Sequence, residues 1–375
     1  MNTDHSFNRR QLLAACTVFF LAPALRLVPG AAVRIAGRAA WVSVPLALPG
    51  ILLYIWFVHS FFARRGDGEG MGELVQRALG RRAARAVLGL FAAWFLLYGS
   101  FMLRSGAERI VTTMYPNAGA ELFIVTMGTL ALIAALDCAR TLVRAANLFL
   151  VTVLGVLFIV LFFALFALER DNLLPVTVLD LPGTADAALA TLDVTVMPVY
   201  IVCFLPGLRR DASGGLRAGL MWGVGITALL TWLVTDIVGT FGAELTSRVT
   251  HPFFMLVKNL VFFKNLERME ALVVSLWVFS DFVVISTCLL AAQRCLRLMM
   301  GHRPPCGGEK MFSLQNGRWV IWLCAAGCVA LALVIAQEPA VLDMWSRRII
   351  PLANLAVALL LVPGVYIAGR IRKTL

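Results

Sequence analysis

The stretch that decides the fold is residues 11–35, QLLAACTVFFLAPALRLVPGAAVRI. It is apolar over the roughly 20 residues that a helix needs to cross a bilayer, and its only charged residues are Arg26 and Arg34. The dipeptide Pro29-Gly30 falls inside it. Because proline removes a backbone donor and clashes with the preceding turn, this stretch predicts a membrane-spanning helix that is interrupted near Pro29.

Similar apolar stretches recur along the chain and predict about ten membrane-spanning helices. The further stretches are residues 41–62, 86–112, 121–137, 144–168, 185–206, 216–241, 271–297, 318–336 and 347–369. Charged residues make up 14% of the chain, whereas soluble domains carry about 25%. Spans and short loops use up the length, so we expect a single polytopic membrane domain over residues 1–375.

The formal net charge of +12 comes mostly from arginines in the short loops between the spans. If the N-terminus is cytoplasmic, the inside segments hold 21 Lys and Arg residues and the outside segments hold 11. This bias follows the positive-inside rule. We therefore expect both termini to be cytoplasmic, and the basic residues to face anionic lipid and not nucleic acid. Residues 66–82 predict a cytoplasmic interfacial helix, and residues 252–263 predict a helix lying on the outer surface.

A second interruption is predicted in the sixth span, at Met197-Pro198-Val199-Tyr200. The two interrupted spans open the first and the second group of five. Interruptions at corresponding positions of two halves indicate a transporter-type binding site near the bilayer midplane. The alternative is that both prolines only kink their helices, with water in the kink.

A site between the two interruptions would use main-chain and side-chain groups together. A half-helix from Gly30 would offer free N–H groups to a carboxylate, and carbonyls near Met197 would receive an ammonium group, a combination that suits an amino acid. Each Ser or Thr has the alternative of bonding to its own or a neighbouring helix. The predicted ligand-binding residues are Arg26, Val28, Pro29, Gly30, Tyr98, Met197, Pro198, Tyr200, Ser280, Asp281, Ser286 and Thr287.

Ionisable residues inside the spans are costly and mark functional sites. Arg26 immediately precedes the first interruption, and we expect it to pair with Asp193 or Asp281. It would then suit a ligand with an extra acid group. The alternative is a structural ion pair, or an arginine that extends to the membrane interface.

Enzyme motifs are absent from the sequence. It contains no phosphate-binding G-x-x-x-x-G-K-S/T loop and no H-E-x-x-H, and its four histidines are far apart. The eight cysteines include no C-x-x-C pair. We therefore expect neither catalysis nor a metal or other cofactor.

Short motifs occur in a particular order along the chain. They are Asn8-Arg9-Arg10-Gln11-Leu12, Trp41-Val42-Ser43, residues 98–104 with Glu108, Thr112-Thr113-Met114-Tyr115-Pro116-Asn117, Asn172-Leu173-Leu174-Pro175 and Leu266-Glu267-Arg268-Met269-Glu270-Ala271-Leu272. In this order and spacing, over roughly residues 8–370, the chain resembles the endospore germination permease family. These are the B subunits of spore germinant receptors, and they are similar to amino-acid permeases of the amino acid–polyamine–organocation superfamily.

The resemblance implies an all-α membrane fold of two inverted repeats, at about 8–168 and 183–370, with helices one and six broken and helices three and eight beside the site. It implies a sensor in the spore inner membrane that binds a small nutrient germinant, typically an amino acid. The implied partners are a receptor A subunit and a lipoprotein C subunit. A secondary transporter of an amino acid or amine, and a structural subunit or conduit without a ligand, stay open as alternatives.

Overall fold

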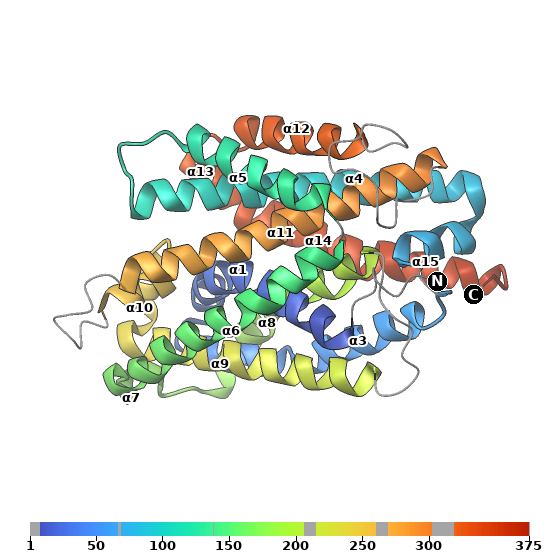
Figure 1. Cartoon of the computed structure of the whole chain (residues 1–375). Coiled ribbons are helices and arrows are strands. Elements are labelled where there is room, and N and C mark those ends of the chain that lie inside the picture. The colour runs from blue at the N-terminus through green and yellow to red at the C-terminus, as the bar shows by residue number, and fades with distance from the viewer. Residues whose placement is uncertain are drawn as a thin grey trace.

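The computed structural model describes residues 8–66, 69–137, 139–205, 215–259, 269–301 and 319–374, and within these ranges the chain forms helices and no strand (Figure 1). The first three residues of the motif at 266–272 lie outside the described residues. The helices are α1 (Arg9–Ala36), α2 (Ala40–Leu46), α3 (Leu48–Phe62), α4 (Met71–Thr113), α5 (Ala120–Leu136), α6 (Ala139–Ala164), α7 (Arg170–Leu173), α8 (Leu181–Ile201), α9 (Gly215–Arg248), α10 (Pro252–Asn259), α11 (Met269–Met300), α12 (Trp319–Val334), α13 (Pro339–Met344), α14 (Ile350–Ala356) and α15 (Val362–Ile371).

All ten predicted apolar stretches are helical. Seven helical segments are long and apolar enough to cross a membrane. The first of them, Arg9–Phe62, contains two spans, α1 and the pair α2 and α3, because Gly37 adopts a positive φ of 55° between them. The shorter apolar helices α5 and α12 complete the ten. The division of these spans into two repeats stays a prediction.

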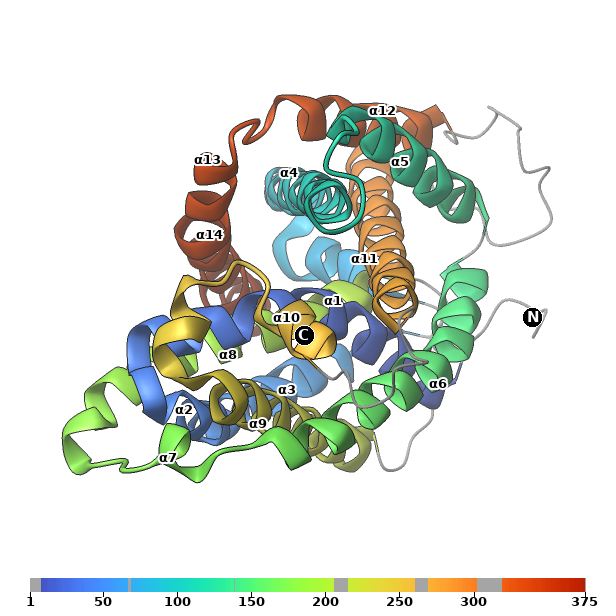
Figure 2. The same cartoon turned by 90° about the vertical axis from the view of Figure 1, so that its left-hand side faces the viewer.

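The helices α1 and α8 form the centre of the bundle, and α11 packs along α4 beside them (Figure 2). In the apolar windows of α1 and α8, 83% and 78% of the residues are buried, against 28% in α6 and in the last span, α13 to α15. The apolar residues that the outer helices expose face lipid and not water. The two central helices are therefore the spans that a ligand site would use.

The predicted interruptions of α1 and α8 are wrong. α1 continues as one helix through Pro23 and Pro29, and α8 continues through Pro198 before a 3-10 turn at Val202–Phe204. Proline adopts a helical φ, so it removes only one bond and disturbs the preceding turn. A side chain from another helix bonds to the main chain near Pro198, where Asn354 donates to the carbonyl of Asp193 at 2.7 Å. Both helices therefore run through Pro29 and Pro198 without a break.

The two predicted short helices are present within the described residues, and residues 67–68 of the first and 260–263 of the second lie outside these. Residues 71–79 form the first turns of α4, which bends at Gly80, where φ is 72°. α10 packs one face against the protein: Phe253 and Phe254 are buried, with their ring centroids 5.7 and 5.9 Å from that of Trp277. Lys258 and Asn259 at its end are exposed, and its placement on the outer surface stays a prediction.

The start of α1 and the end of α15 lie at one end of the bundle, which we call the terminal face. There Thr374 donates from its hydroxyl to the carbonyl of Ala78 at 3.4 Å. At the same end the first turns of α4 are tied to α11, since Glu73 pairs with Arg294 and Gln76 donates to the carbonyl of Leu298 at 2.8 Å. These contacts close the terminal face.

Candidate ligand-binding site

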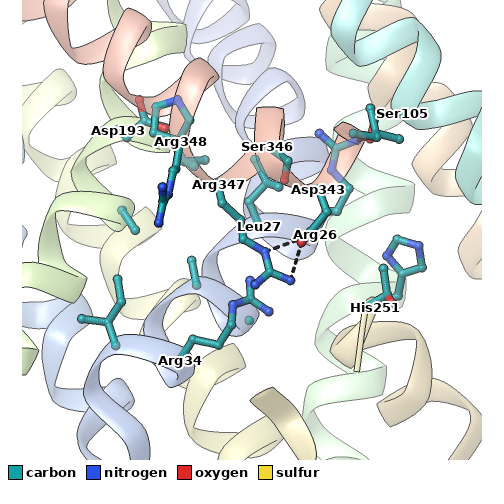
Figure 3. Close-up of a pocket in the computed structure, with 18 of the residues that line it drawn as sticks. Arg26, Leu27, Arg34, Ser105, Asp193, His251, Asp343, Ser346, Arg347 and Arg348 are labelled. Atoms are coloured by element: carbon teal, nitrogen blue, oxygen red, sulfur yellow. Dashed lines mark hydrogen bonds and ion pairs between the residues drawn. The ribbon is translucent and has the colours of Figure 1, made fainter. Parts of the chain in front are cut away.

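A cavity of about 800 Å³ lies towards the end of the bundle opposite the terminal face (Figure 3). Its walls come from the second half of α1, the last turns of α4, the first turns of α8, residues 250–251 before α10, and α13 to α14. Residues at its rim, such as Ile35, Asp186 and Arg348, are exposed. The cavity therefore extends from buried residues to an exposed rim.

The α1 wall carries a stripe of three residues, Arg26, Gly30 and Arg34, which are four positions apart and so lie on one face of the helix. The guanidinium group of Arg34 lies back over Gly30. A Cβ atom at Gly30 would be 3.2 Å from Nη1 of Arg34, which is too close for comfortable contact. The absence of a side chain at Gly30 thus lets Arg34 approach the inner part of the cavity.

Arg26 is buried, with 8% of its surface exposed, and lines the inner part of the cavity. Its guanidinium group donates to the hydroxyl of Ser105 and to the sulfur of Met102 at 3.3 Å. Its Nε has no hydrogen-bond partner among the described residues. Burial of a charge without an opposite charge is costly, so Arg26 is a group to which an anionic ligand would add stability.

The predicted pair between Arg26 and Asp281 is wrong, because Asp281 pairs with Arg109. Arg109 and Asp281 are 2% and 0% exposed, and the Arg109 guanidinium also lies 4.9 Å from the ring centroid of Trp277. Arg109 approaches from α4 to the carboxylate on α11, so the pair joins these two helices. Asp281 is therefore bonded to Arg109, and Arg26 is left without an ion-pair partner among the described residues. Burial, then Arg109, then Arg26 lower the pKa of His251 to about 4.

The α8 wall carries Asp193, which is 4% exposed and lines the cavity opposite Arg26's helix. It does not pair with Arg26. Nδ2 of Asn354 on α14 donates to its Oδ1 at 2.6 Å. The hydroxyl of Tyr200 donates to Oδ1 of Asn354 at 2.8 Å and accepts from Nε1 of Trp94 at 2.7 Å. A chain of hydrogen bonds thus runs from the cavity wall through α14 and α8 to α4.

Of the twelve predicted site residues, Arg26 and Gly30 line this cavity. Asp281 is one contact away, behind Arg109, and Tyr200 is connected through Asn354 and Asp193. The others pack or bond inside the protein. Their positions are as follows: Val28, Pro29, Met197 and Pro198 are buried in the helix packing, Tyr98 stacks on Phe19 at 6.4 Å, and Ser280, Ser286 and Thr287 donate to the carbonyls of Val18, Ala131 and Val283.

Three residues that the sequence reasoning missed are central to the site: Arg109, Ser105 and Asn354. Arg109 and Ser105 fall one turn apart inside an apolar stretch, which is the signal of an interior polar face. Asn354 is the one amide side chain in the stretch 347–369. Their depth could be inferred from the sequence, but their partners could not.

Comparisons with known proteins agree with the architecture. A family model described as "Spore germination protein" matches residues 7–339. The chain is 24% identical over 262 residues, which is 70% of this chain and 71% of the relative, to YfkT of Bacillus subtilis (strain 168), whose name assigns it to spore germination.

Two solved transporter structures are similar in fold. One is a Na⁺-coupled sialic acid symporter in its substrate-bound outward-open state, with a TM-score of 0.61, 12% identity, and coverage of 96% of this chain and 78% of that chain. The other is Mhp1, a nucleobase-cation-symport-1 family transporter, in a closed conformation with bromovinylhydantoin bound, with a TM-score of 0.62, 14% identity, and coverage of 98% and 80%. The expected amino-acid-permease-like architecture is confirmed, and the chain belongs to the spore germination protein family.

Proposed function

We propose that this chain is the membrane subunit of a spore germinant receptor, and that it binds a small nutrient germinant, an amino acid, in the cavity between α1, α4, α8 and α14. The single observation that carries the proposal is that two opposite charges line one cavity: Arg26 on α1 and Asp193 on α8, neither of which has an ion-pair partner within the described residues. A zwitterion would supply both missing charges.

The proposal places the protein in the spore inner membrane with both termini cytoplasmic, in complex with an A subunit and a lipoprotein C subunit. The terminal face would then be cytoplasmic, and the cavity would open to the outside. Binding signals only if the ligand has different affinities for two states of the protein. Opening of the contacts between α4 and α11 at the terminal face is the change that such a difference would drive.

Germination of spores tests the receptor role. Deletion of the gene in its own spore-forming host should abolish germination on at least one amino acid, and the wild-type gene should restore it. The Arg26→Gln variant should fail to restore it, whereas Arg38→Gln, which removes one exposed charge near the end of α1, should succeed. Normal germination of the deletion strain on all nutrients would contradict the proposal.

The second candidate is a secondary transporter of an amino acid or amine, which the fold shared with two transporters favours. Uptake distinguishes the two. Proteoliposomes that contain the purified chain should bind a radiolabelled amino acid without accumulating it if the chain is only a sensor. Accumulation above that of Arg26→Gln proteoliposomes would favour the transporter.

A further inference from the structure

The charged residues around the cavity do not cancel. Five arginines and four carboxylates line it: Arg26, Arg34, Arg109, Arg347 and Arg348, and Glu108, Asp186, Asp193 and Asp343. A lining with one positive charge in excess favours a ligand whose own net charge is negative.

Ion pairs within the protein account for part of this set. Arg347 pairs with Asp343 at 2.7 Å, and Glu108 pairs with Arg104, outside the lining, at 3.2 Å. Arg109 pairs with Asp281, which also lies outside the lining. Among the described residues, three arginines and two aspartates of the lining are left without an ion pair: Arg26, Arg34 and Arg348, and Asp186 and Asp193.

The unpaired groups are arranged by depth. Arg26 and Asp193 are buried on facing central helices, and these two would bind the carboxylate and the ammonium of any amino acid. Arg34 lies one turn beyond Gly30 and is half-buried, and its guanidinium group folds back over Gly30. Arg348 is exposed at the rim. Two further positive charges without an ion pair therefore line the outer part of the same cavity.

Two carboxylates offset these outer arginines in part: Asp343 pairs with Arg347 and also lies near Arg34, and Asp186 is exposed at the start of α8. Gly30 lies four residues, or about 6 Å along the helix axis, from Arg26 on one side and from Arg34 on the other. Arg34 folds back over Gly30, and the charged groups nearest to it in the lining are Arg347 and Asp343. The outer part of the lining thus holds three arginines, Arg34, Arg347 and Arg348, against two carboxylates, Asp186 and Asp343.

We propose that the ligand of this cavity is an acidic amino acid, with one carboxylate at Arg26, the ammonium group at Asp193, and the second carboxylate at Arg34 and Arg348. This inference rests on the proposed function, since it names the chemical class of the ligand of the same cavity. It depends on side chains of α1, α8 and the segment Trp345–Ile349, and it requires no interruption of α1 or α8.

Pairs of amino acids that differ only in a carboxylate or an amide test this ligand class. Calorimetric titration of the purified full chain in lipid nanodiscs should give a Kd for aspartate or glutamate about tenfold or more below that of asparagine or glutamine, because a charge-assisted bond is lost with the amide. Binding of the amides as tightly as the acids would overturn the inference. It would leave the proposed function intact.

Variants locate the second carboxylate. The double variant Arg34→Gln/Arg348→Gln should bring the acid and the amide to within about threefold of each other, with the Kd of the amide unchanged. The control Arg38→Gln/Arg170→Gln loses the same charge from exposed residues outside the lining and should keep the tenfold preference. A preference that survives in the double variant would refute the roles of Arg34 and Arg348. Binding of a neutral amino acid or of an amine, without binding of the acids, would refute the inference alone. Failure of every small nutrient to bind would also refute the proposed function.

Discussion

The ion pair between Arg109 and Asp281 is the contact that most sharply separates the observed site from the predicted one. The sequence favoured Arg26 as the partner of Asp281, whereas the structure places Arg109 there with both groups almost fully buried. Asp281→Asn leaves Arg109 buried without a counter-charge, and Arg109→Gln leaves Asp281 buried without one. Each single change should cost about 3–5 kcal/mol, the usual cost of breaking a buried pair by removal of one partner.

The double variant Arg109→Gln/Asp281→Asn removes both charges and should cost about as much as one single variant. The two changes should therefore be coupled by about 3 kcal/mol. Arg26→Gln combined with Asp281→Asn is the matched control, and these two changes should add without coupling, because Arg26 bonds to Ser105.

Reversible unfolding of the purified chain in detergent, followed by tryptophan fluorescence, measures these free energies. The nine tryptophans of the chain, with Trp277 beside the Arg109 guanidinium among them, report its unfolding. A larger coupling between Arg26 and Asp281 than between Arg109 and Asp281 would show that the pairing described above does not form. Additive costs in both pairs would show that the buried pair contributes nothing.

Three further outcomes are expected. Asn354→Ala should destabilise the protein by about 1–3 kcal/mol in the same unfolding assay, because buried groups on α8 lose their bonds; an unchanged stability would contradict the hydrogen-bond chain. Glu73→Gln breaks the contact with Arg294 and should raise the rate at which a water-soluble maleimide labels buried Cys295 by about tenfold, and an equal rate would mean that the pair does not close the terminal face. His251 stays neutral in the folded protein down to pH about 4, whereas in the unfolded chain it takes up a proton below about 6.5. Its folded form binds fewer protons in this window, so stability falls as the pH falls from about 6.5 to about 4; His251→Gln should show a shallower fall there and the same stability as wild type above pH 7, and parallel curves would refute this.

The membrane spans could be predicted because the bilayer imposes a length and an apolar composition on each one. Residues 11–35 and 347–369 show how local this information is, since each stretch alone indicates its helix. The positive φ of Gly37, which divides the first two spans, could be expected in the same way from a glycine between two apolar stretches.

The continuity of α1 and α8 could not be predicted, because the sequence shows only which hydrogen bond a proline removes. Whether the helix opens depends on what the neighbouring helices supply. Here Asn354 supplies a donor to α8 near Pro198 from a position far away in the sequence. The partner of Asp281 is likewise decided by packing, since Arg26 and Arg109 both come within reach of its helix and only one side chain bonds to it.

The residues that cover one face of α10 could not be predicted for a related reason. Pro252 to Asn259 is short and apolar, a pattern typical of interfacial helices. The pattern carries no information about an aromatic residue on another helix that could cover it. Trp277 does so, and Phe253 and Phe254 are therefore buried.

The last span contains two π-helical segments, Trp345–Ile349 and Val357–Leu361, on either side of the helix that carries Asn354. Each wide turn accommodates one residue more than an α-helical ladder would hold there. Relaxation of the first segment to α-helix would rotate the helix beyond it by about 100°. Asn354 would then turn away from Asp193, and the Arg348 side chain would change its position relative to α14. Relaxation of this one segment would thus turn a local change at the cavity into rotation of a lipid-facing surface.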